Sequence, residues 1–186
     1  MINYLRIRDN GRAAVGIIYF DYKRQKEQII RVVLASLLRQ IFETQMEASV
    51  VIEDFYTRWS ARNTPPTEAD VQEALRAGIS KCHEAYIVLD ALDEYLTTFS
   101  NEAIENLLAR LLSLGDNVKL MVTSRVLGAM EGIFWKLEAI RLEIFARNED
   151  MGIYVEDRIA KELPFAADLS GLIIEKVMQA AGSRYV

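Results

Sequence analysis

The feature that most constrains the fold is a short apolar run at residues 86–89 that leads directly into acidic residues. Such a continuous run is typical of a strand that is covered on both faces of a parallel sheet, and it is far too short to span a membrane. Asp90 ends the run, and Asp93 and Glu94 follow it closely. Because open α/β sheets bind ligands at the carboxyl ends of their strands, we expect a functional site at these carboxylates.

Two further apolar runs, 15–20 and 118–122, predict additional strands, and the imperfect alternation of 137–144 predicts a fourth. Elsewhere, apolar residues recur every three or four positions, as they do in amphipathic helices. The expected helices cover 23–47, 50–62, 67–81, 101–114, 128–136, 148–163 and 168–181. Strands that alternate with helices in this way predict a three-layer α/β domain with a parallel sheet.

Two local patterns concern the boundaries of these elements. Thr67 and Asp70 have the spacing of a capping box, which predicts the start of a helix after Pro66. The triplet at 9–11, Asp-Asn-Gly, fits either a hairpin turn between strands 2–8 and 13–20 or the end of a helix. The pattern alone leaves both alternatives open.

Composition narrows the class of protein. A chain of 186 residues is long enough for one domain whose core needs no disulfide. Its net charge of -5 argues against a general nucleic-acid binder, which needs many lysine and arginine contacts to phosphate. The sequence has no apolar run of membrane-spanning length and no signal pattern at its start. Because Cys82 is the single cysteine, a reducing compartment is the simplest expectation, and we predict a cytoplasmic protein with no membrane partner.

Several segments carry a family resemblance through their order and spacing. They are 16–22 (GIIYFDY), 34–40 (LASLLRQ), 87–94 (IVLDALDE), 119–125 (KLMVTSR) and the stretch 142–154. Together they resemble the NACHT module of STAND P-loop NTPases, in particular the nephrocystin-3-like N-terminal type of fungal ankyrin- or WD-repeat proteins. The resemblance covers most of the chain, and the pairing of an acidic Walker B strand with a later Thr-Ser-Arg is its most specific part.

The resemblance implies a role for each residue of the acidic edge. Asp90 would hold Mg²⁺, which takes one or two protein carboxylates besides water and phosphate oxygens. Asp93 or Glu94 would polarise the water that attacks ATP or GTP, as catalytic residues. An arginine beside them can bind a phosphate through two parallel hydrogen bonds. The residues expected to sense the nucleotide are Thr123, Ser124 and Arg125.

One departure from the family pattern affects the expected function. The sequence contains no Gly-x-x-x-x-Gly-Lys-[Ser/Thr] motif, because the glycine-containing stretch at 11–16 continues with Ile17 and Ile18. In the family this phosphate-binding loop precedes the segment that matches residues 2–8. The chain is therefore expected to be a truncated module that begins just after its own phosphate-binding loop. Without the loop's N–H groups and lysine, a polyphosphate would meet mainly carboxylates, so we expect no nucleotide or Mg²⁺ to bind to this chain alone.

These expectations define one domain over 1–186, with a core at 12–145 and a helical part at 147–186. Its parallel strands should neighbour one another in the order 15–20, 86–90, 118–122. The strand 137–144 should lie beside a vacant slot or pair directly with 118–122. An incomplete sheet exposes backbone groups, so we expect self-association, an upstream phosphate-loop segment or other protein modules as partners.

Three functions remain in competition at this point. The first is a fragment of a NACHT-type nucleotide switch that cannot bind or hydrolyse nucleotide alone. The second is a protein-interaction module that retains the NTPase fold without catalysis. The third is a metal-dependent α/β hydrolase that uses the acidic edge. The first is preferred, which makes this chain by itself not an enzyme.

Overall fold

The computed structural model describes residues 13–24, 27–61, 64–96, 100–125, 128–144, 148–163, 165 and 169–182. The triplet at 9–11, for which a hairpin turn and the end of a helix were both open, therefore lies outside the described residues. The chain forms two compact units, Met1–Ala139 and Ile140–Val186. Each unit is described by itself below.

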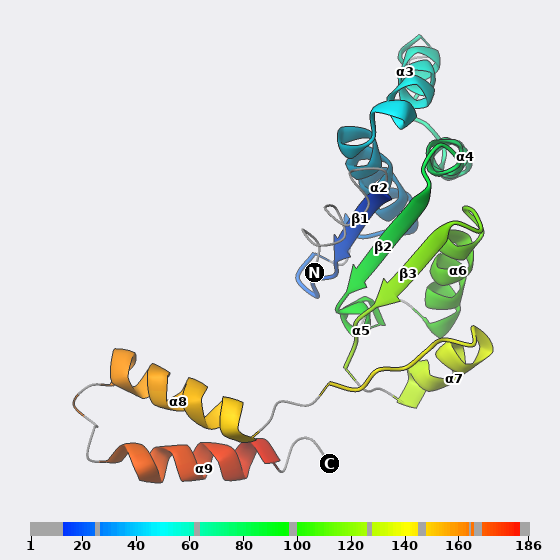
Figure 1. Ribbon diagram of the computed structural model, residues 1–186. Helices are drawn as coiled ribbons and strands as arrows, with labels where there is room; N and C mark the ends of the chain where they lie inside the picture. Colours follow the sequence, from blue (N-terminus) through cyan, green and yellow to red (C-terminus); the bar gives the residue numbers. More distant parts are fainter. Residues whose placement is uncertain are drawn as a thin grey trace. The chain divides into compact units, whose positions relative to one another are not determined.

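The first unit is organised around a parallel sheet of three strands, shown as arrows in Figure 1. The strands are β1 (Ala13–Tyr19), β2 (Glu84–Asp90) and β3 (Val118–Val122), in the spatial order β1-β2-β3. Both pairs are parallel, with Tyr19 opposite Asp90 and Leu89 opposite Val122. The predicted strand order and directions are thus confirmed, and the α/β class with them.

Most predicted helices of this unit are present, and two differ from the prediction. The helices are α2 (Ile30–Thr44), α3 (Met46–Ser60), α4 (Glu68–Ile79), α5 (Leu92–Leu96), α6 (Asn101–Leu112) and α7 (Gly128–Lys136). The first helix was predicted from residue 23, which is wrong because Ile29 is extended and the Gln28 side chain is bonded back to the end of β1. The short helix α5 was not predicted. The capping box at Thr67 and Asp70 is confirmed.

One face of the sheet carries the main hydrophobic core. The side chains at even positions of β1 and odd positions of β2 lie in one core with buried residues of α2, α4 and α6. The strand residues buried in this core are Ala14, Ile18, Ala85, Ile87 and Leu89. On the other face, Ala13, Val15 and Val88 are also buried, but they lie outside this core. A third layer therefore remains a prediction.

Helix α2 approaches β1 closely at Gly16. A β-carbon built on Gly16 would lie 2.6 Å from Leu37 Cδ2, closer than two carbons can approach without a shift. Leu37 is fully buried. Glycine is thus favoured here, because any larger residue would have to displace the buried Leu37 side chain that packs against β1.

The outer edge of β1 is bonded by glutamine side chains. Phe20 N–H donates to Asp90 O, so the backbone N–H and C=O groups of even positions in β1 point toward β2, and those of odd positions point away from the sheet. Gln40 accepts from Ile17 N–H and donates to Ile17 O, both at 2.8 Å. Gln45 donates to Ala13 O and Gln28 donates to Tyr19 O, also at 2.8 Å. These amides satisfy backbone groups that an edge strand otherwise leaves for another strand.

The strand predicted at 137–144 is absent, which corrects the expected architecture. Leu137 N–H bonds to Ile133 O, and Ala139 N–H bonds to Phe134 O, so the backbone here completes α7. Glu138 has a φ of 51°, the left-handed conformation that commonly ends helices. Residues 140–144 form no regular secondary structure. The alternation that predicted a strand is real, but in the described residues no sheet neighbour pairs with it.

The second unit is a pair of helices, α8 (Asn148–Glu162) and α9 (Ser170–Gly182), which pack against each other. Ile159 is the one hydrophobic side chain of this unit that is buried among the described residues. None of the helices described in either unit is long and apolar enough to cross a bilayer.

Candidate functional site

The carboxyl ends of the three strands meet at one edge of the sheet, as their arrowheads show in Figure 1. The segments that follow them are 20–24, 91–96 and 123–125. Every residue predicted for the site lies in or beside these segments. Parallel strands bring their ends together in this way, so the sequence prediction of a shared edge is geometrically sound.

Asp90 is fixed by the strand beside it. The Thr123 hydroxyl donates to Asp90 Oδ1 at 2.5 Å and accepts from Ala91 N–H at 3.0 Å. Ala91 has a φ of 55°, a left-handed conformation that is costly for a residue with a side chain. Leu92 N–H also bonds to Thr123 O at 2.9 Å. Thr123 therefore holds both the carboxylate and the strained turn that redirects the chain from β2 into α5.

Asp93 is a buried carboxylate bonded to Arg125. Its side chain is only 3% exposed, whereas that of Arg125 is 75% exposed. Asp93 Oδ2 accepts from Arg125 Nε at 2.5 Å, and Oδ1 accepts from Arg125 N–H at 3.2 Å. The hydrogen bond to Asp93 and the charges of Asp93 and Glu94 raise the pKa of Arg125. The guanidinium predicted to sense a nucleotide is thus already held by one of the predicted catalytic residues.

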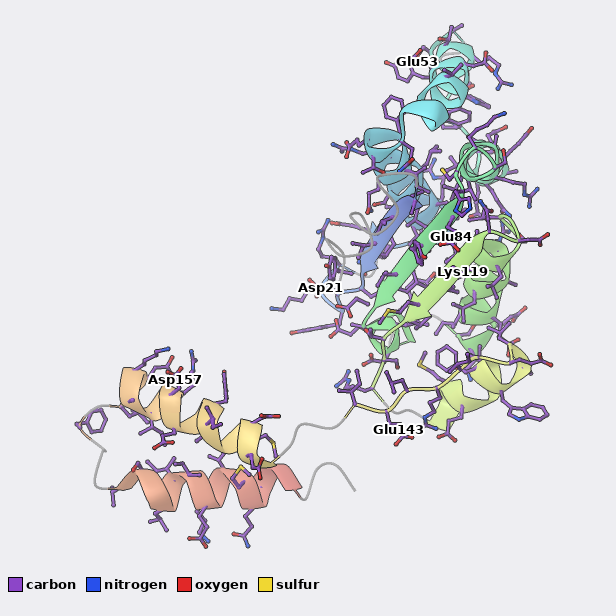
Figure 2. All side chains as sticks on the ribbon, in the orientation of Figure 1. Asp21, Glu53, Glu84, Lys119, Glu143 and Asp157 are labelled. Atoms are coloured by element: carbon purple, nitrogen blue, oxygen red, sulfur yellow. The ribbon has the colours of Figure 1, made fainter. Side chains whose placement is uncertain are left out.

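Glu94 connects the edge to the segment after β1. Glu94 Oε2 accepts from Tyr22 N–H at 2.9 Å. Nearby, Asp21 Oδ1 accepts from Lys23 N–H at 2.8 Å, and Figure 2 labels Asp21 beyond the end of β1. Asp90, Asp93 and Glu94 therefore each bond to the segment that follows a neighbouring strand. The carboxylates connect the three strand ends to one another.

Helix α5 places Asp93 and Glu94 because its apolar residues are anchored in the core. Leu92 and Tyr95 are buried, and the Tyr95 ring lies 4.9 Å from the ring of Phe20, centroid to centroid. Burial raises the pKa of Tyr95 to about 12, with a further contribution from the charge of Glu68.

The remaining predicted residue, Ser124, donates to Arg125 O at 2.7 Å and contacts Met130 on α7.

The described residues fit a magnesium ion only weakly and a nucleotide poorly. Mg²⁺ prefers one or two carboxylates and several waters, and Asp90 could supply one such carboxylate. Both oxygens of Asp93 already accept bonds from Arg125. In the described part of the chain, no three acidic, histidine or cysteine side chains form a metal-binding group. The carboxylates of Asp90, Asp93 and Glu94 would oppose a polyphosphate at this edge, whereas the guanidinium of Arg125 would attract it.

A comparison with known families identifies the chain. Residues 1–125 match the model of the family described as nephrocystin 3, N-terminal. The chain belongs to this family. No curated protein and no solved structure matches the chain in the same comparisons. The nephrocystin 3 match ends at Arg125 and includes every predicted site residue, and a family described as an N-terminal part is compatible with a region of a larger protein.

Sequence reasoning placed the site residues at one edge but missed their contacts. The bonds of Asp93 with Arg125 and of Glu94 with Tyr22 join side chains to backbone groups far away in the chain. No spacing rule predicts such contacts, because they depend on where the turns place each N–H group. A left-handed Ala91 also has no sequence signal, since glycine or asparagine usually occupies that conformation.

Proposed function

We propose that the chain is part of a nucleotide-dependent signalling switch of the NACHT type, and that it binds nucleotide only together with a phosphate-binding loop supplied by another segment. The observation that supports this proposal is the adjacency of Asp90, Asp93 and Arg125 at the ends of two parallel strands. An acidic group for Mg²⁺ and a guanidinium for phosphate are the components that phosphoryl-transfer sites require.

In this proposal Arg125 acts by exchanging partners. Its guanidinium is mostly exposed and is held by Asp93, so an incoming terminal phosphate would compete with this carboxylate. Displacement of the guanidinium would leave the 3.2 Å hydrogen bond from Arg125 N–H to Asp93 Oδ1 as the remaining link between the two residues. The segment after β3 could then report the presence of the phosphate to the helix that follows it.

Electrostatics supports the expectation that the described edge alone does not bind nucleotide. Two like charges at 4 Å repel by about 1 kcal/mol in water and by several kcal/mol in a partly buried site. Three carboxylates at the edge therefore oppose a polyphosphate unless backbone N–H groups, a lysine and Mg²⁺ offset them. We expect no hydrolysis by this chain in isolation.

A chimera tests the proposal. The phosphate-loop strand and helix of a family member are fused before Met1, and binding of ATP and GTP with Mg²⁺ is measured by calorimetry. The chimera should bind one of them at roughly micromolar Kd, whereas the chain alone should show no binding below about 1 mM. Asp90→Asn should weaken binding to the chimera at least tenfold, and Asp116→Asn, an exposed aspartate at the other end of β3, should not. Micromolar binding by the chain alone would contradict the proposal.

The sensing role of Arg125 has a separate measurement. In the chimera, Arg125→Gln should reduce the preference for triphosphate over diphosphate while leaving diphosphate affinity nearly unchanged. Lys119→Gln, which removes an exposed positive charge from the same strand, is the matched control. Equal loss of affinity for both nucleotides would indicate that Arg125 only stabilises the edge.

A second candidate is a protein-interaction module that retains the fold without binding nucleotide. It is favoured by the engagement of all three carboxylates in bonds that connect the strand ends. A folded chimera that binds neither nucleotide would support this alternative. The metal-dependent hydrolase has no comparable support in the described residues.

A further inference from the structure

A small open cavity lies between α3 and α4 and shares no residue with the acidic edge of the sheet. Its volume is about 110 Å³. Phe55 and Trp59 line it from α3, where residues four positions apart lie on one face of a helix. Ala74 and Ala77 line it from α4, and their small side chains leave space between the two helices. The cavity therefore combines aromatic side chains on one helix with little bulk on the other.

The two aromatic side chains suit a positively charged ligand. Both are half-buried, and their ring centroids lie 6.1 Å apart with the ring planes tilted by 50°. Phe55 also packs against the hydrophobic core, which anchors this side of the cavity. The face of an aromatic ring is electron-rich and attracts a cation that lies within about 6 Å of its centroid.

The charges that line the cavity favour the same kind of ligand. Asp70 and Glu73 line it from α4. Asp70 accepts from Thr67 N–H at 2.8 Å, which fixes its position at the start of the helix. Glu73 is exposed, and within the described residues no hydrogen bond or ion pair engages its side chain. Arg58 also lines the cavity, but its guanidinium is paired with Asp54 at 2.8 Å.

The volume indicates how much of a ligand can enter. Sites for cofactors and drug-sized molecules have volumes of roughly 300–1,000 Å³, so a cavity of about 110 Å³ fits only the charged end of a ligand. A guanidinium suits this lining better than an ammonium, because it can stack on an aromatic ring and donate two parallel hydrogen bonds to a carboxylate. The carboxylate of a free amino acid would be repelled by the acidic lining. An arginine within another protein carries no such group.

We propose that the cavity between α3 and α4 is a docking site for an arginine side chain of a partner protein. The guanidinium stacks on Trp59 and donates to Glu73, and the aliphatic part of the side chain contacts Phe55. A single side chain contributes only a small part of the affinity of a protein interface. Capped arginine alone should accordingly bind with a Kd of roughly 1–10 mM.

Titration with N-acetyl-arginine amide tests the site. In a Trp135→Phe background, which changes an exposed side chain of α7, Trp59 is the remaining tryptophan and its fluorescence reports on the cavity. The fluorescence should change saturably with added arginine amide. N-acetyl-citrulline amide, which has the same shape without the charge, should bind at least fivefold more weakly. Equal binding of the two compounds, or no saturable change up to roughly 100 mM arginine amide, would overturn the proposal.

Charge variants distinguish this cavity from general attraction to an acidic protein. Glu73→Gln should weaken the binding of arginine amide at least fivefold. Glu53→Gln is the matched control, because Glu53 is an exposed carboxylate of α3, labelled in Figure 2, that does not line the cavity. This control should change the affinity less than about twofold, since exposed charges at a distance are screened by salt. Equal losses in the two variants would refute a specific contact with Glu73.

Two further comparisons test the stacking and the source of the arginine. Trp59→Leu should weaken binding at least threefold, as measured by NMR amide shifts, whereas Trp59→Phe should lose less because it keeps a ring. An unchanged affinity in Trp59→Leu would rule out stacking. A capped Gly-Arg-Gly peptide should bind within about twofold of capped arginine, because its backbone remains outside the cavity. Binding of capped arginine without binding of the peptide would exclude a partner protein as the source.

Discussion

The glutamine bonds along β1 give the sharpest prediction for stability. Gln40 replaces a neighbouring strand at Ile17 by accepting from its N–H and donating to its C=O, each at 2.8 Å. Gln40→Met keeps a side chain of similar length and volume but removes both bonds. Ile17 and Gln40 are half-buried, so water can reach the freed backbone groups only partly.

The magnitude follows from the two bonds. Each net hydrogen bond contributes about 0.5–1.5 kcal/mol, and each incompletely solvated group adds to the loss. Gln40→Met should therefore destabilise the first unit by about 2–3 kcal/mol, which corresponds to a Tm lower by roughly 5–10 °C for a chain of this size. The thioether fills the space left by the amide, so little of this change comes from a cavity.

Denaturant unfolding and hydrogen exchange measure the effect. In Gln40→Met, exchange at the Ile17 amide should accelerate more than exchange at the Ile18 amide, which faces β2. Arg31→Met, an exposed substitution on the same helix, should change stability by less than about 0.5 kcal/mol. A Gln40→Met protein as stable as the parent, or equal acceleration at both amides, would refute the claim that the glutamine substitutes for a strand.

Three further substitutions test the core and the loops. The folded state favours the neutral Tyr95 phenol, because its pKa is raised to about 12, so the free energy of unfolding should fall as pH rises above about 10. Tyr95→Phe should remove about 1–2 kcal/mol of this alkaline loss, after discount for solvent screening. Urea unfolding at roughly pH 9 and pH 11.5 measures the difference. Gly16→Val should cost about 2–3 kcal/mol through its clash with Leu37, and Leu37→Ala should recover part of that cost in the double variant. Asn117→Ala should lower the free energy of unfolding by about 1–2 kcal/mol in the same assay. The Asn117 amide donates to Ile79 O, at the end of α4, and to Cys82 O, just after it.

Each of these has a contradicting result. An alkaline decline that is identical in parent and Tyr95→Phe would place the cause in other groups. Strictly additive costs for Gly16→Val and Leu37→Ala would mean that the two residues do not compete for the same space. An Asn117→Ala protein with unchanged stability would show that water replaces both amide bonds at no cost.

The sheet could be predicted from sequence because its determinants are local. The apolar run before Asp90 and the run at 118–122 are long enough to identify buried strands, and their polar ends identify the shared edge. The capping box at Thr67 is local for the same reason, since its two residues lie one helical turn apart. Local sequence patterns were therefore sufficient to predict these strands and this helix start.

The features that were missed depend on tertiary contacts. Helix α2 begins at Ile30 instead of residue 23 because Gln28 is bonded to the end of β1, a contact that helical periodicity cannot reveal. The alternation at 137–144 predicted a strand, which is wrong, because the backbone at 137–139 completes α7 and a strand forms only where a neighbour accepts its hydrogen bonds. The salt bridge between Asp93 and Arg125 likewise depends on the turn at Ala91.

The glutamine side chains along β1 also make the sheet chemically unequal at its two borders. On the β1 side, amide groups occupy the positions where an incoming strand would bind, so addition there would require breaking existing bonds. At β3, no side-chain bond of this kind occupies the outward backbone positions in the described residues. The sheet can therefore gain a strand more easily at one edge than at the other, and any added strand should pair with β3.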